Sequence, residues 1–366
     1  MPKKKVLFFC GGNKVFGAEI VTLSVLKEMK ESGYDILCIS NGWNDGHFHK
    51  RLEKLGIPYI PVKLGMFYLS RLWWTLDTLI HLPKALYSIG KIIRKFNPDV
   101  IFHVSYGSLL VTYPFLKNRK NIFLIFDPYY GKLKKQYFKW LNQYVQTYVA
   151  VSDAIKSNLV NIGVLPEKIL VFKNGINTDS SVRLKAPGDI IHFGIVGQIV
   201  PRKGHADVIE ALKMLKFKNI EFKCVIIGSG NNDFINQLKE KIKEYQLQDH
   251  VIWRDFIENR DEIYQLFHVI LIPSTTLDPL PTTAMEAGLY YKPAIVTNMG
   301  GLPEIVIDQV TGFVIEPNNP LELAQKMEIL IDPKTIHEIG KAAHIHIIEQ
   351  FDIKSQIELV YNLIDS

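Results

Sequence analysis

Two carboxylates bracket a short stretch that is otherwise rich in proline and threonine. Asp278 and Glu286 open and close the sequence DPLPTTAME, which follows the apolar run VILIPS. Proline is favoured at the first position of a helix, so we expect a helix to begin near Pro281. Asp278 then lies in the loop before that helix, and Glu286 lies about one turn inside it.

The predicted helix start is suited to binding an anion. The N–H groups around residues 280–283 have no partner within the helix and lie at the positive end of its dipole. A carboxylate on either side suits a ligand that carries hydroxyl groups as well as phosphate, and a nucleotide-sugar carries both. Acidic residues also occur near helix starts simply because they interact favourably with the dipole, and that interpretation stays open.

Two adjacent cations follow another predicted strand. The stretch IVGQIVPRKGHADVIEAL (195–212) predicts a strand, a loop that contains Arg202 and Lys203, and a helix. A pair of cations at the end of a strand suits a diphosphate, although basic pairs are also common on surfaces. Glycine turns follow in IIGSGN (226–231) and in NMGGLPEIV (298–306), where Glu304 opens a helix.

Strands and helices alternate along the whole chain. Apolar runs that end in turn residues predict strands at 5–11, 34–41, 57–63, 99–105, 121–127, 147–153, 168–175, 190–198, 222–230, 250–256, 268–274, 292–298 and 311–317. Helical spacing is found at 18–33, 205–216, 232–247, 260–267, 320–331 and from 336 onward. This alternation predicts an α/β protein whose parallel sheets carry helices on both faces.

A polar stretch, 178–189, interrupts the alternation. We therefore expect an N-terminal Rossmann-like domain over 1–178, a linker over 179–189 and a second Rossmann-like domain over 190–345. A C-terminal helix over 346–366 is expected to cross back to the first domain. Ligands of open α/β sheets bind beyond the carboxyl ends of the strands, where all the glycine turns lie, so the two domains are expected to face each other across a cleft.

The composition is that of a globular protein from a reducing compartment. Apolar residues make up 47% and charged residues 22%, and the three cysteines are far apart in the sequence. No apolar stretch approaches the length of a transmembrane helix. The opening KKKVLFFCGG has too short an apolar part for a signal peptide, so we interpret it as a strand and expect a cytoplasmic protein.

The net charge of +6 is unevenly distributed. Residues 1–185 contain 27 Lys and Arg against 12 Asp and Glu, a net +15, and residues 186–366 contain 16 against 25, a net −9. The asymmetry indicates an anionic partner for the first half: nucleic acid, an acidic membrane face or an anionic acceptor. A solvated basic surface is the plain alternative. Segment 65–96 combines aromatic and basic residues, which favours an anionic membrane surface over an ordinary helix with buried aromatics.

Taken together and in this order, the stretches resemble the retaining GT-B glycosyltransferases of family 4 (glycosyl transferases group 1). The family's second domain contains G-R-x-x-x-x-K-G, I-G-x-G, P-S, E-x7-E, G-G-x-x-E and T-G. The matching residues here are Gly197-Gln198, Lys203-Gly204, Gly228-Ser229-Gly230, Pro273-Ser274, Asp278 to Glu286, Gly300-Gly301 with Glu304, and Thr311-Gly312. In the first half, FGAEIVTLSVLKEM resembles the family's G-G-A-E helix, and 149–177 resembles its segment ending in Asn-Gly.

The resemblance implies a role for each matching residue. Lys203 and Arg202 would hold the donor diphosphate, Glu286 the ribose hydroxyls and Asp278 the hydroxyls of the transferred sugar. Further donor contacts would come from Gly197, Gln198, Gly228 and the backbone of Leu280, Thr282 and Thr283. Gly17 would allow close approach of its loop to the donor phosphate and the acceptor, and Asn174 and Gly175 would shape the cleft wall.

Three departures from the family pattern put sugar or acceptor identity in doubt. The family's first Glu is the shorter Asp278, and its usual Arg is Gln198, for which Arg202 would substitute. A histidine of the family is replaced by Phe126 and Asp127, so Asp127 joins Asp278, Lys203 and Arg202 as a catalytic candidate. His103 is the nearest histidine and is considered for the acceptor side, with a structural role as its alternative.

The family transfers with retention, a reaction in which the leaving phosphate helps to deprotonate the acceptor. Catalysis then depends on positioning and on stabilising the leaving diphosphate. No Asp-x-Asp signature occurs, and DGHFHK (45–50) and HIHIIE (344–349) are interpreted as surface features, so we expect no metal and no cofactor. The expected partners are a nucleotide-sugar donor, with UDP favoured, and a glycan or lipid-linked acceptor of surface polysaccharide or lipopolysaccharide biosynthesis.

Two other functions are weighed against this one. A GT-B-like epimerase would act on a nucleotide-sugar without an acceptor. A nucleic-acid-binding module would use the basic half, but no groove-reading motif accompanies the charge, and the other half is acidic.

Overall fold

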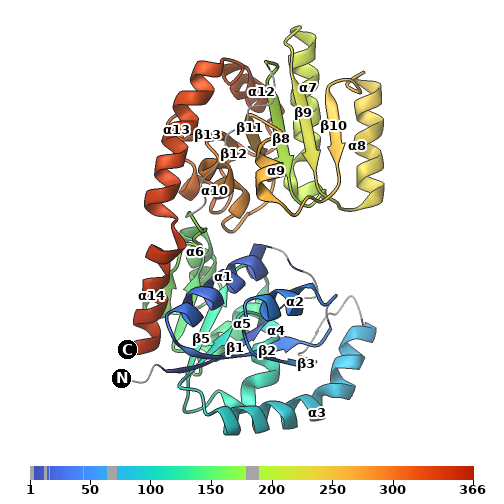
Figure 1. Cartoon of the computed structure of the whole chain (residues 1–366). Helices are drawn as coiled ribbons and strands as arrows, with labels where there is room; N and C mark the ends of the chain where they lie inside the picture. The colour runs from blue at the N-terminus through green and yellow to red at the C-terminus, as the bar shows by residue number, and fades with distance from the viewer. Residues whose placement is uncertain (1–3, 12–14, 16, 44, 64–71, 179–188) are drawn as a thin grey trace. The chain divides into compact units, whose positions relative to one another are not determined.

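The chain forms two compact units. The computed structural model describes residues 4–11, 15, 17–43, 45–63, 72–178 and 189–366 (Figure 1). Unit 1 comprises Met1–Gly175 together with Ile353–Ser366, and unit 2 comprises Ile176–Asp352. Of the predicted linker, 179–188 lies outside the described residues.

Unit 1 is built on a parallel sheet of seven strands in the order β3-β2-β1-β4-β5-β6-β7. Its strands are β1 (Lys5–Cys10), β2 (Asp35–Asn41), β3 (Tyr59–Val62), β4 (Val100–His103), β5 (Lys120–Ile125), β6 (Thr147–Ala150) and β7 (Ile169–Val171). Its helices are α1 (Gly17–Glu31), α2 (His47–Lys54), α3 (Leu72–Phe96), α4 (Tyr106–Thr112), α5 (Lys132–Leu141), α6 (Asp153–Asn161) and α14 (Ile353–Asp365), with 3-10 turns at Tyr113–Phe115 and Pro166–Lys168.

Most strands of unit 1 are apolar runs because helices cover the sheet, whereas Ile60 and Pro61 of the edge strand β3 are exposed. Side chains of α3, including Ala85, Ile89 and Ile93, form one cluster with Leu7 of β1 and Ile101 of β4. Burial on both faces is typical of a parallel sheet, and it explains why the runs were recognisable in the sequence.

Unit 2 is built on a six-stranded parallel sheet in the order β10-β9-β8-β11-β12-β13. Its strands are β8 (His192–Val196), β9 (Lys223–Ile227), β10 (Val251–Arg254), β11 (Val269–Ile272), β12 (Ala294–Thr297) and β13 (Gly312–Ile315). Its helices are α7 (His205–Phe217), α8 (Asn232–Glu244), α9 (Arg260–Tyr264), α10 (Thr282–Leu289), α11 (Leu302–Ile305), α12 (Pro320–Ile329) and α13 (Pro333–Gln350), with a 3-10 turn at Pro201–Lys203.

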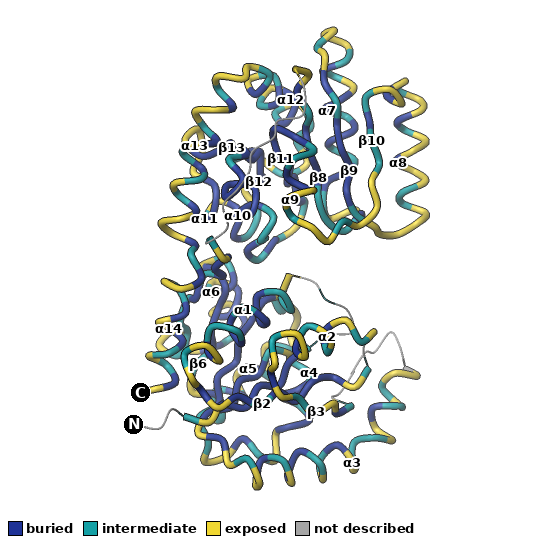
Figure 2. The backbone as a smooth tube through the Cα atoms, viewed as in Figure 1, coloured by how far each residue is buried: buried dark blue, intermediate teal, exposed yellow. Residues whose placement is uncertain are grey.

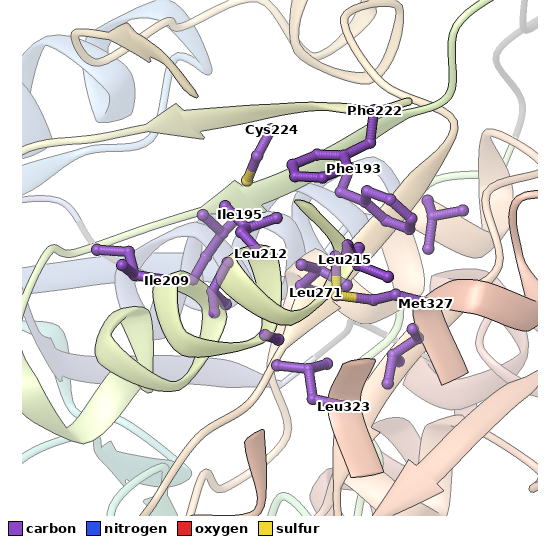
Figure 3. Packing of buried hydrophobic residues seen from close by; sticks show 14 of the residues in the cluster. Phe193, Ile195, Ile209, Leu212, Leu215, Phe222, Cys224, Leu271, Leu323 and Met327 are labelled. Atoms are coloured by element: carbon purple, nitrogen blue, oxygen red, sulfur yellow. The ribbon is translucent and has the colours of Figure 1, made fainter. Parts of the chain in front are cut away.

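The core of unit 2 joins its sheet to α7 and α12. Phe193 and Phe222 lie on the strand side, and Leu212 and Leu215 of α7 meet Met327 of α12 beneath them (Figure 3). This core holds β8 and β11 side by side as parallel neighbours.

The strand order of unit 2 explains where its polar loops meet. β8 connects through α7 to β9 on one side, whereas β11 pairs with β8 on the other side. The loops that leave β8 and β11 at their carboxyl ends therefore part in opposite directions, which is the switch point where α/β sheets bind ligands. Lys203 lies in the first loop and Asp278 in the second.

The C-terminal helices belong to different units. α13 packs on α10 in unit 2, and α14 contacts α1 in unit 1. The returning helix begins at Ile353, whereas the sequence-based boundary of 346 falls inside α13. All three cysteines are buried and unpaired. Within the described residues, no helix has the length and apolar character needed to cross a bilayer.

Candidate functional site

The loop between β11 and α10 positions the first carboxylate. Pro281 is the N-cap residue of α10, with Thr282 as the first helical residue, so the predicted helix start is confirmed. The hydroxyl of Thr297 on β12 donates a hydrogen bond of 2.7 Å to the carbonyl of Ser274, which fixes the loop where it leaves β11. Ser274 and Asp278 are both buried.

Asp278 meets the predicted phosphate cation directly. The Lys203 Nζ atom lies 2.6 Å from Asp278 Oδ2, and the Ser274 hydroxyl donates to the same oxygen at 2.8 Å. The Lys203 side chain keeps 20% of its surface exposed, against 6% for Asp278. Charge-assisted hydrogen bonds of this length are among the stronger ones in proteins, so a buried carboxylate and a partly exposed ammonium are held together.

The loops that carry these two residues are also joined through their backbones. Thr275 N donates to the Arg202 carbonyl at 2.9 Å. Gly204 has a φ of +71°, and a Cβ there would lie 1.9 Å from the Pro273 carbonyl oxygen. Only glycine permits both this left-handed conformation and the close approach. Gly204 therefore keeps Lys203 next to the end of β11.

The other glycine motifs pack in the same way. Gly228 has a φ of +144°, and a Cβ there would lie 1.9 Å from the carbonyl oxygen of Gly197, which itself has a φ of +140°. Gly300, with a φ of +65°, would place a Cβ 2.1 Å from the carbonyl oxygen of Asp278. Gly301 N donates to that same carbonyl at 2.8 Å. The glycines noted in the sequence thus let four loops pack backbone against backbone around Lys203 and Asp278.

Glu286 has its own set of partners. The hydroxyl of Tyr264 on α9 donates to Glu286 Oε2 at 2.9 Å, and Arg260 Nε lies 3.4 Å from Oε1. Burial raises the pKa of Glu286, and the Arg260 charge and the Tyr264 hydrogen bond oppose part of that rise. Tyr264 is fully buried, and its hydroxyl is also 3.2 Å from the carbonyl of Thr283.

The remaining donor-side residues frame this pair of carboxylates. Leu280 is buried just before α10, and Thr282 and Thr283 are half-buried in its first turn. Arg202 is exposed, whereas Gln198 is half-buried between Gly197 and Ile199. The N-terminus of α10 and the two cations of the β8–α7 loop therefore belong to one unit, in which Lys203 is already fixed beside the loop that leads into α10.

His205 adds no third cation. It is the first residue of α7 and is buried, and neither of its ring nitrogens has a hydrogen-bond partner among the described residues. Burial and the charge of Lys203 lower its pKa to about 4, so the ring is neutral near pH 7.

The candidates of unit 1 are scattered more widely. Gly17 is the exposed first residue of α1, and a Cβ there would meet no atom within 4 Å. Asn174 is buried, and its Oδ1 has no hydrogen-bond partner in the described part of the chain; Gly175 follows it. Asp127 is exposed two residues after β5, next to the buried Phe126. Gly17 begins a helix, and the other residues lie in loops that follow a strand.

The structure argues against the predicted acceptor role of His103. The residue ends β4, is fully buried and stacks on Phe9 with ring centroids 5.2 Å apart. Burial lowers its pKa to about 3. A neutral ring without exposed surface suits the alternative, a structural histidine of the sheet.

Several residues that support the site have no recognisable signal in the sequence. Tyr264 and Arg260 are spaced by four in RDEIYQLF and so share a helix face, but nothing in that stretch indicates that Glu286 is their partner. Ser274 was noted only as part of a motif. Among the described residues, no cluster of three or more His, Cys, Asp or Glu could hold a metal ion.

Comparisons with known proteins agree with this architecture. The model for Glycosyltransferase Family 4 matches residues 15–180, and the model for Glycosyl transferases group 1 matches 178–346. A putative colanic acid biosynthesis glycosyltransferase of Salmonella typhimurium is 28% identical over 215 residues, 55% of this chain and 52% of that protein. The UDP-Gal:alpha-D-GlcNAc-diphosphoundecaprenol alpha-1,3-galactosyltransferase of Escherichia coli is 24% identical over 213 residues, 54% of each chain.

A solved structure extends the likeness to the whole fold. HepE of Anabaena, in complex with UDP and glucose, superposes with a TM-score of 0.83 at 19% identity, covering 99% of this chain and 100% of that one. The sequence matches span about half the length of the curated relatives. The two family models together account for both units, and the fold is GT-B. The chain belongs to the family 4, group 1 glycosyltransferases.

Proposed function

We propose that this protein transfers a sugar, with retention, from a nucleotide-sugar to a glycan or lipid-linked acceptor in the biosynthesis of a surface polysaccharide or lipopolysaccharide. The observation that carries the proposal is the Lys203–Asp278–Ser274 contact where the β8–α7 and β11–α10 loops meet. It joins a phosphate-binding cation to a sugar-binding carboxylate at the start of a helix. The epimerase alternative finds no support in the relatives described above.

Lys203 and Asp278 would act in sequence as the donor binds. The diphosphate carries more negative charge than one carboxylate, so it would compete with Asp278 for the Lys203 ammonium. Asp278 would then retain its hydrogen bond from Ser274 and could accept further hydrogen bonds from the sugar hydroxyls. The N-terminus of α10, with Leu280, Thr282 and Thr283, would bind the phosphates from the other side. The ion pair thus holds both groups ready for a ligand with both chemistries.

Glu286 would bind the ribose diol. Each of its oxygens already has one partner, Arg260 or Tyr264, which fixes the plane of the carboxylate. A carboxylate oxygen can accept more than one hydrogen bond, so two hydroxyl donors can still be received. Burial strengthens such hydrogen bonds because water competes less for the same oxygens.

The transfer itself would need little acid–base chemistry from the protein. The bond between the anomeric carbon and the phosphate oxygen breaks, the bond to the acceptor oxygen forms on the same face, and the acceptor proton passes to the leaving phosphate. Lys203, with Arg202 beside it, would stabilise the charge that develops on the diphosphate. Asp127 remains a candidate for a contact near the reacting carbon, in the position where the family pattern has histidine.

The substrates are proposed from the relatives. The Escherichia coli relative uses a UDP-sugar and a diphosphoundecaprenol-linked acceptor, and the Anabaena structure contains UDP and glucose. We therefore favour a UDP-sugar donor and an acceptor carried on a lipid diphosphate at an anionic membrane surface. We also propose that the reaction needs no metal and takes place in the cytoplasm.

A transfer assay tests this proposal. The full-length protein is incubated with UDP-glucose, UDP-galactose or UDP-N-acetylglucosamine and a short-chain lipid-diphosphate monosaccharide. Mass spectrometry should detect an acceptor extended by one sugar. The proton coupling constant at the new linkage should show the same anomeric configuration as in the donor. Epimerised donor formed without acceptor, or a product of inverted configuration, would overturn the proposal.

A further inference from the structure

Helix α3 presents an unusual apolar surface to solvent. Trp73 is 82% exposed, Ile80 is 74% exposed and Tyr87 is 70% exposed, and Leu76 lies between them at 48%. Steps of three, four and seven residues separate these side chains, so they share one face of the helix. Figure 2 shows exposed positions repeating along α3, which lies at the periphery of unit 1. Trp74 and Leu79 widen the same exposed region.

The opposite face of α3 packs against the sheet of unit 1. Ala85, Ile89 and Ile93 are buried in the cluster that covers the sheet of unit 1. None of the exposed apolar side chains named above belongs to that cluster. Exposed apolar patches of this extent usually mark an interaction surface, because leaving them in water is unfavourable.

Basic residues continue the exposed face toward the end of the helix. Lys84, Lys91 and Arg94 follow the apolar positions at the same helical spacing, and Lys95 adjoins them. All four are exposed, and none has an ion pair or side-chain hydrogen bond among the described residues. The single acidic residue of the helix, Asp77, lies 3.7 Å from Lys63 and 3.1 Å from His81. The exposed face is therefore apolar and cationic, with its one carboxylate neutralised.

An apolar stripe beside a row of cations indicates the kind of partner more closely than either feature alone. Trp and Tyr place an apolar ring and a polar group at the same depth, which suits the boundary between acyl chains and headgroups. Lys and Arg reach lipid phosphates from the same level through their long aliphatic stems. A helix with this division lies in the plane of a bilayer surface. A protein partner would have to match both the apolar stripe and four uncompensated cations.

We infer that the exposed face of α3, defined by Trp73, Leu76, Ile80, Tyr87, Lys84, Lys91 and Arg94, binds an anionic lipid surface. The apolar side chains enter the headgroup region, and the cations contact lipid phosphates. Of the segment predicted from the sequence, 65–71 lies outside the described residues, and the surface named here needs only α3. The inference concerns unit 1 alone and does not depend on the donor site or on the transfer reaction.

Vesicle flotation with charge-reversal variants tests the inference. The vesicles contain phosphatidylcholine with about 30% phosphatidylglycerol, so that their surface is anionic. They should bind the protein, and vesicles of pure phosphatidylcholine should bind far less of it. The triple variant Lys84→Glu, Lys91→Glu, Arg94→Glu should lower the partition coefficient by about a hundredfold. The matched control Lys50→Glu, Lys54→Glu, Lys341→Glu has the same net charge, with its substitutions on α2 and α13, and should lose less than about fivefold.

The apolar stripe is tested separately. Trp73→Ser with Ile80→Ser should weaken binding by about tenfold or more, whereas Phe217→Ser with Leu321→Ser, two exposed positions of unit 2, should not. Lipids brominated in the acyl chain should quench tryptophan fluorescence on binding, and Trp73→Phe with Trp74→Phe should lose most of that quenching. Circular dichroism of each variant checks that it is folded.

Two results would overturn the inference. One is vesicle binding that is absent, or equal in the α3 variants and their controls. The other is a dimer in sedimentation equilibrium that the α3 variants dissociate without vesicles, because α3 would then bind a second copy of the chain. Donor binding measured on the same preparations reports on unit 2 and separates this outcome from any failure of the proposed reaction.

Discussion

Asp278 is held in place by a cation and a hydroxyl that both contact the same oxygen. The Lys203 ammonium and the Ser274 hydroxyl both contact Oδ2, and the carboxylate is buried. A buried carboxylate is stable only when it is paired, so the folded protein depends on Lys203 for this purpose. The same cation is needed by a diphosphate. A substitution of Asp278 should therefore affect binding of the sugar, and a substitution of Lys203 should affect binding of the diphosphate.

Asp278→Asn separates the sugar from the nucleotide. We expect affinity for the UDP-sugar to fall by about tenfold or more, because the carboxylate that accepts the sugar hydroxyls is lost. Affinity for UDP alone should stay the same or rise, because Lys203 is released from its ion pair. Titration of one variant with both ligands measures the difference, and an equal loss for UDP and UDP-sugar would contradict the assignment.

Glu286→Gln should separate stability from binding. Burial raises the pKa of Glu286 above its ordinary value of 4.5, so the ionised form is less favoured in the folded protein than in the unfolded chain. The stabilising contribution of this group is therefore complete below about pH 4.5 and is lost as the pH rises through the folded pKa. The Gln variant should match the wild type near that pH and gain stability over it toward pH 8.

Urea unfolding at several pH values between 4.5 and 8 checks this prediction, and UDP titration of the same variant should show weaker binding. Glu338→Gln, at an exposed position of α13, is the control. A stability difference that does not change with pH would indicate that Arg260 and Tyr264 fully compensate the burial of Glu286.

At the scale of elements, the site is a set of loops that pack through glycine. Gly228→Ala should destabilise the protein by about 3 kcal/mol or more, because its positive φ and its 1.9 Å approach to the Gly197 carbonyl both exclude a Cβ. Gly17→Ala is the matched control, since a Cβ there meets nothing within 4 Å, and its stability should change by less than about 1 kcal/mol. Denaturant unfolding measures the free energy of unfolding of both variants. Equal values for Gly228→Ala and Gly17→Ala would contradict the close packing at Gly228.

Gly17→Ala also tests the predicted role of that residue. If the loop before α1 approaches the donor phosphate as the resemblance implies, a methyl group there should reduce transfer without reducing stability. Unchanged turnover by the folded variant would remove Gly17 from the site.

Many of the helix and strand positions could be predicted from the sequence. Several strands are largely buried apolar runs that end at a glycine or a proline, as β1, β8, β9 and β11 do, so their positions followed from local pattern. The proline before Thr282 correctly marked the start of α10. The contact of Lys203 with Asp278 joins residues 75 positions apart. Only the strand order, which places β11 beside β8, brings them together, and no local pattern contains that order.

Burial decided between the two roles that the sequence left open for His103. His103 ends a strand, as an exposed ligand-binding histidine would, but its neighbours Phe9 and Phe123 enclose it within the sheet. The partners of Glu286 were missed, because the pairing of α9 with α10 depends on tertiary packing. Segment 65–96 was correctly identified as basic and aromatic, but within 73–96 only the structure separates the exposed side chains from those in the core.

At the scale of the whole molecule, the C-terminal helix completes unit 1. Ile353, Ile357, Val360 and Ile364 of α14 are buried, and the Lys4 ammonium donates to the Ile364 carbonyl at 2.6 Å. Tyr34 donates a hydrogen bond of 2.9 Å to Asp365, and burial followed by that contact raises the pKa of the tyrosine. The last residues of the chain are thus part of the fold of the first unit.

Ile357→Asp should therefore destabilise unit 1 by about 3–5 kcal/mol while unit 2 keeps its stability. Four of the five tryptophans, Trp43, Trp73, Trp74 and Trp140, belong to unit 1, so their fluorescence reports on its unfolding. Leu359→Asp, at a half-exposed position of the same helix, is the control and should cost far less. A protein that loses UDP binding in parallel with the fluorescence change would show that the units do not unfold separately.

The most direct test of the donor site is a calorimetric titration with UDP, GDP and their sugar conjugates. The titration is carried out on the wild type, on Lys203→Ala and Glu286→Ala, and on the exposed controls Lys334→Ala and Glu338→Ala. We predict that one nucleotide binds, that each site variant weakens it by about tenfold or more, and that the controls leave it within about twofold. Binding that survives both site variants, or no binding of any nucleotide, would contradict the account.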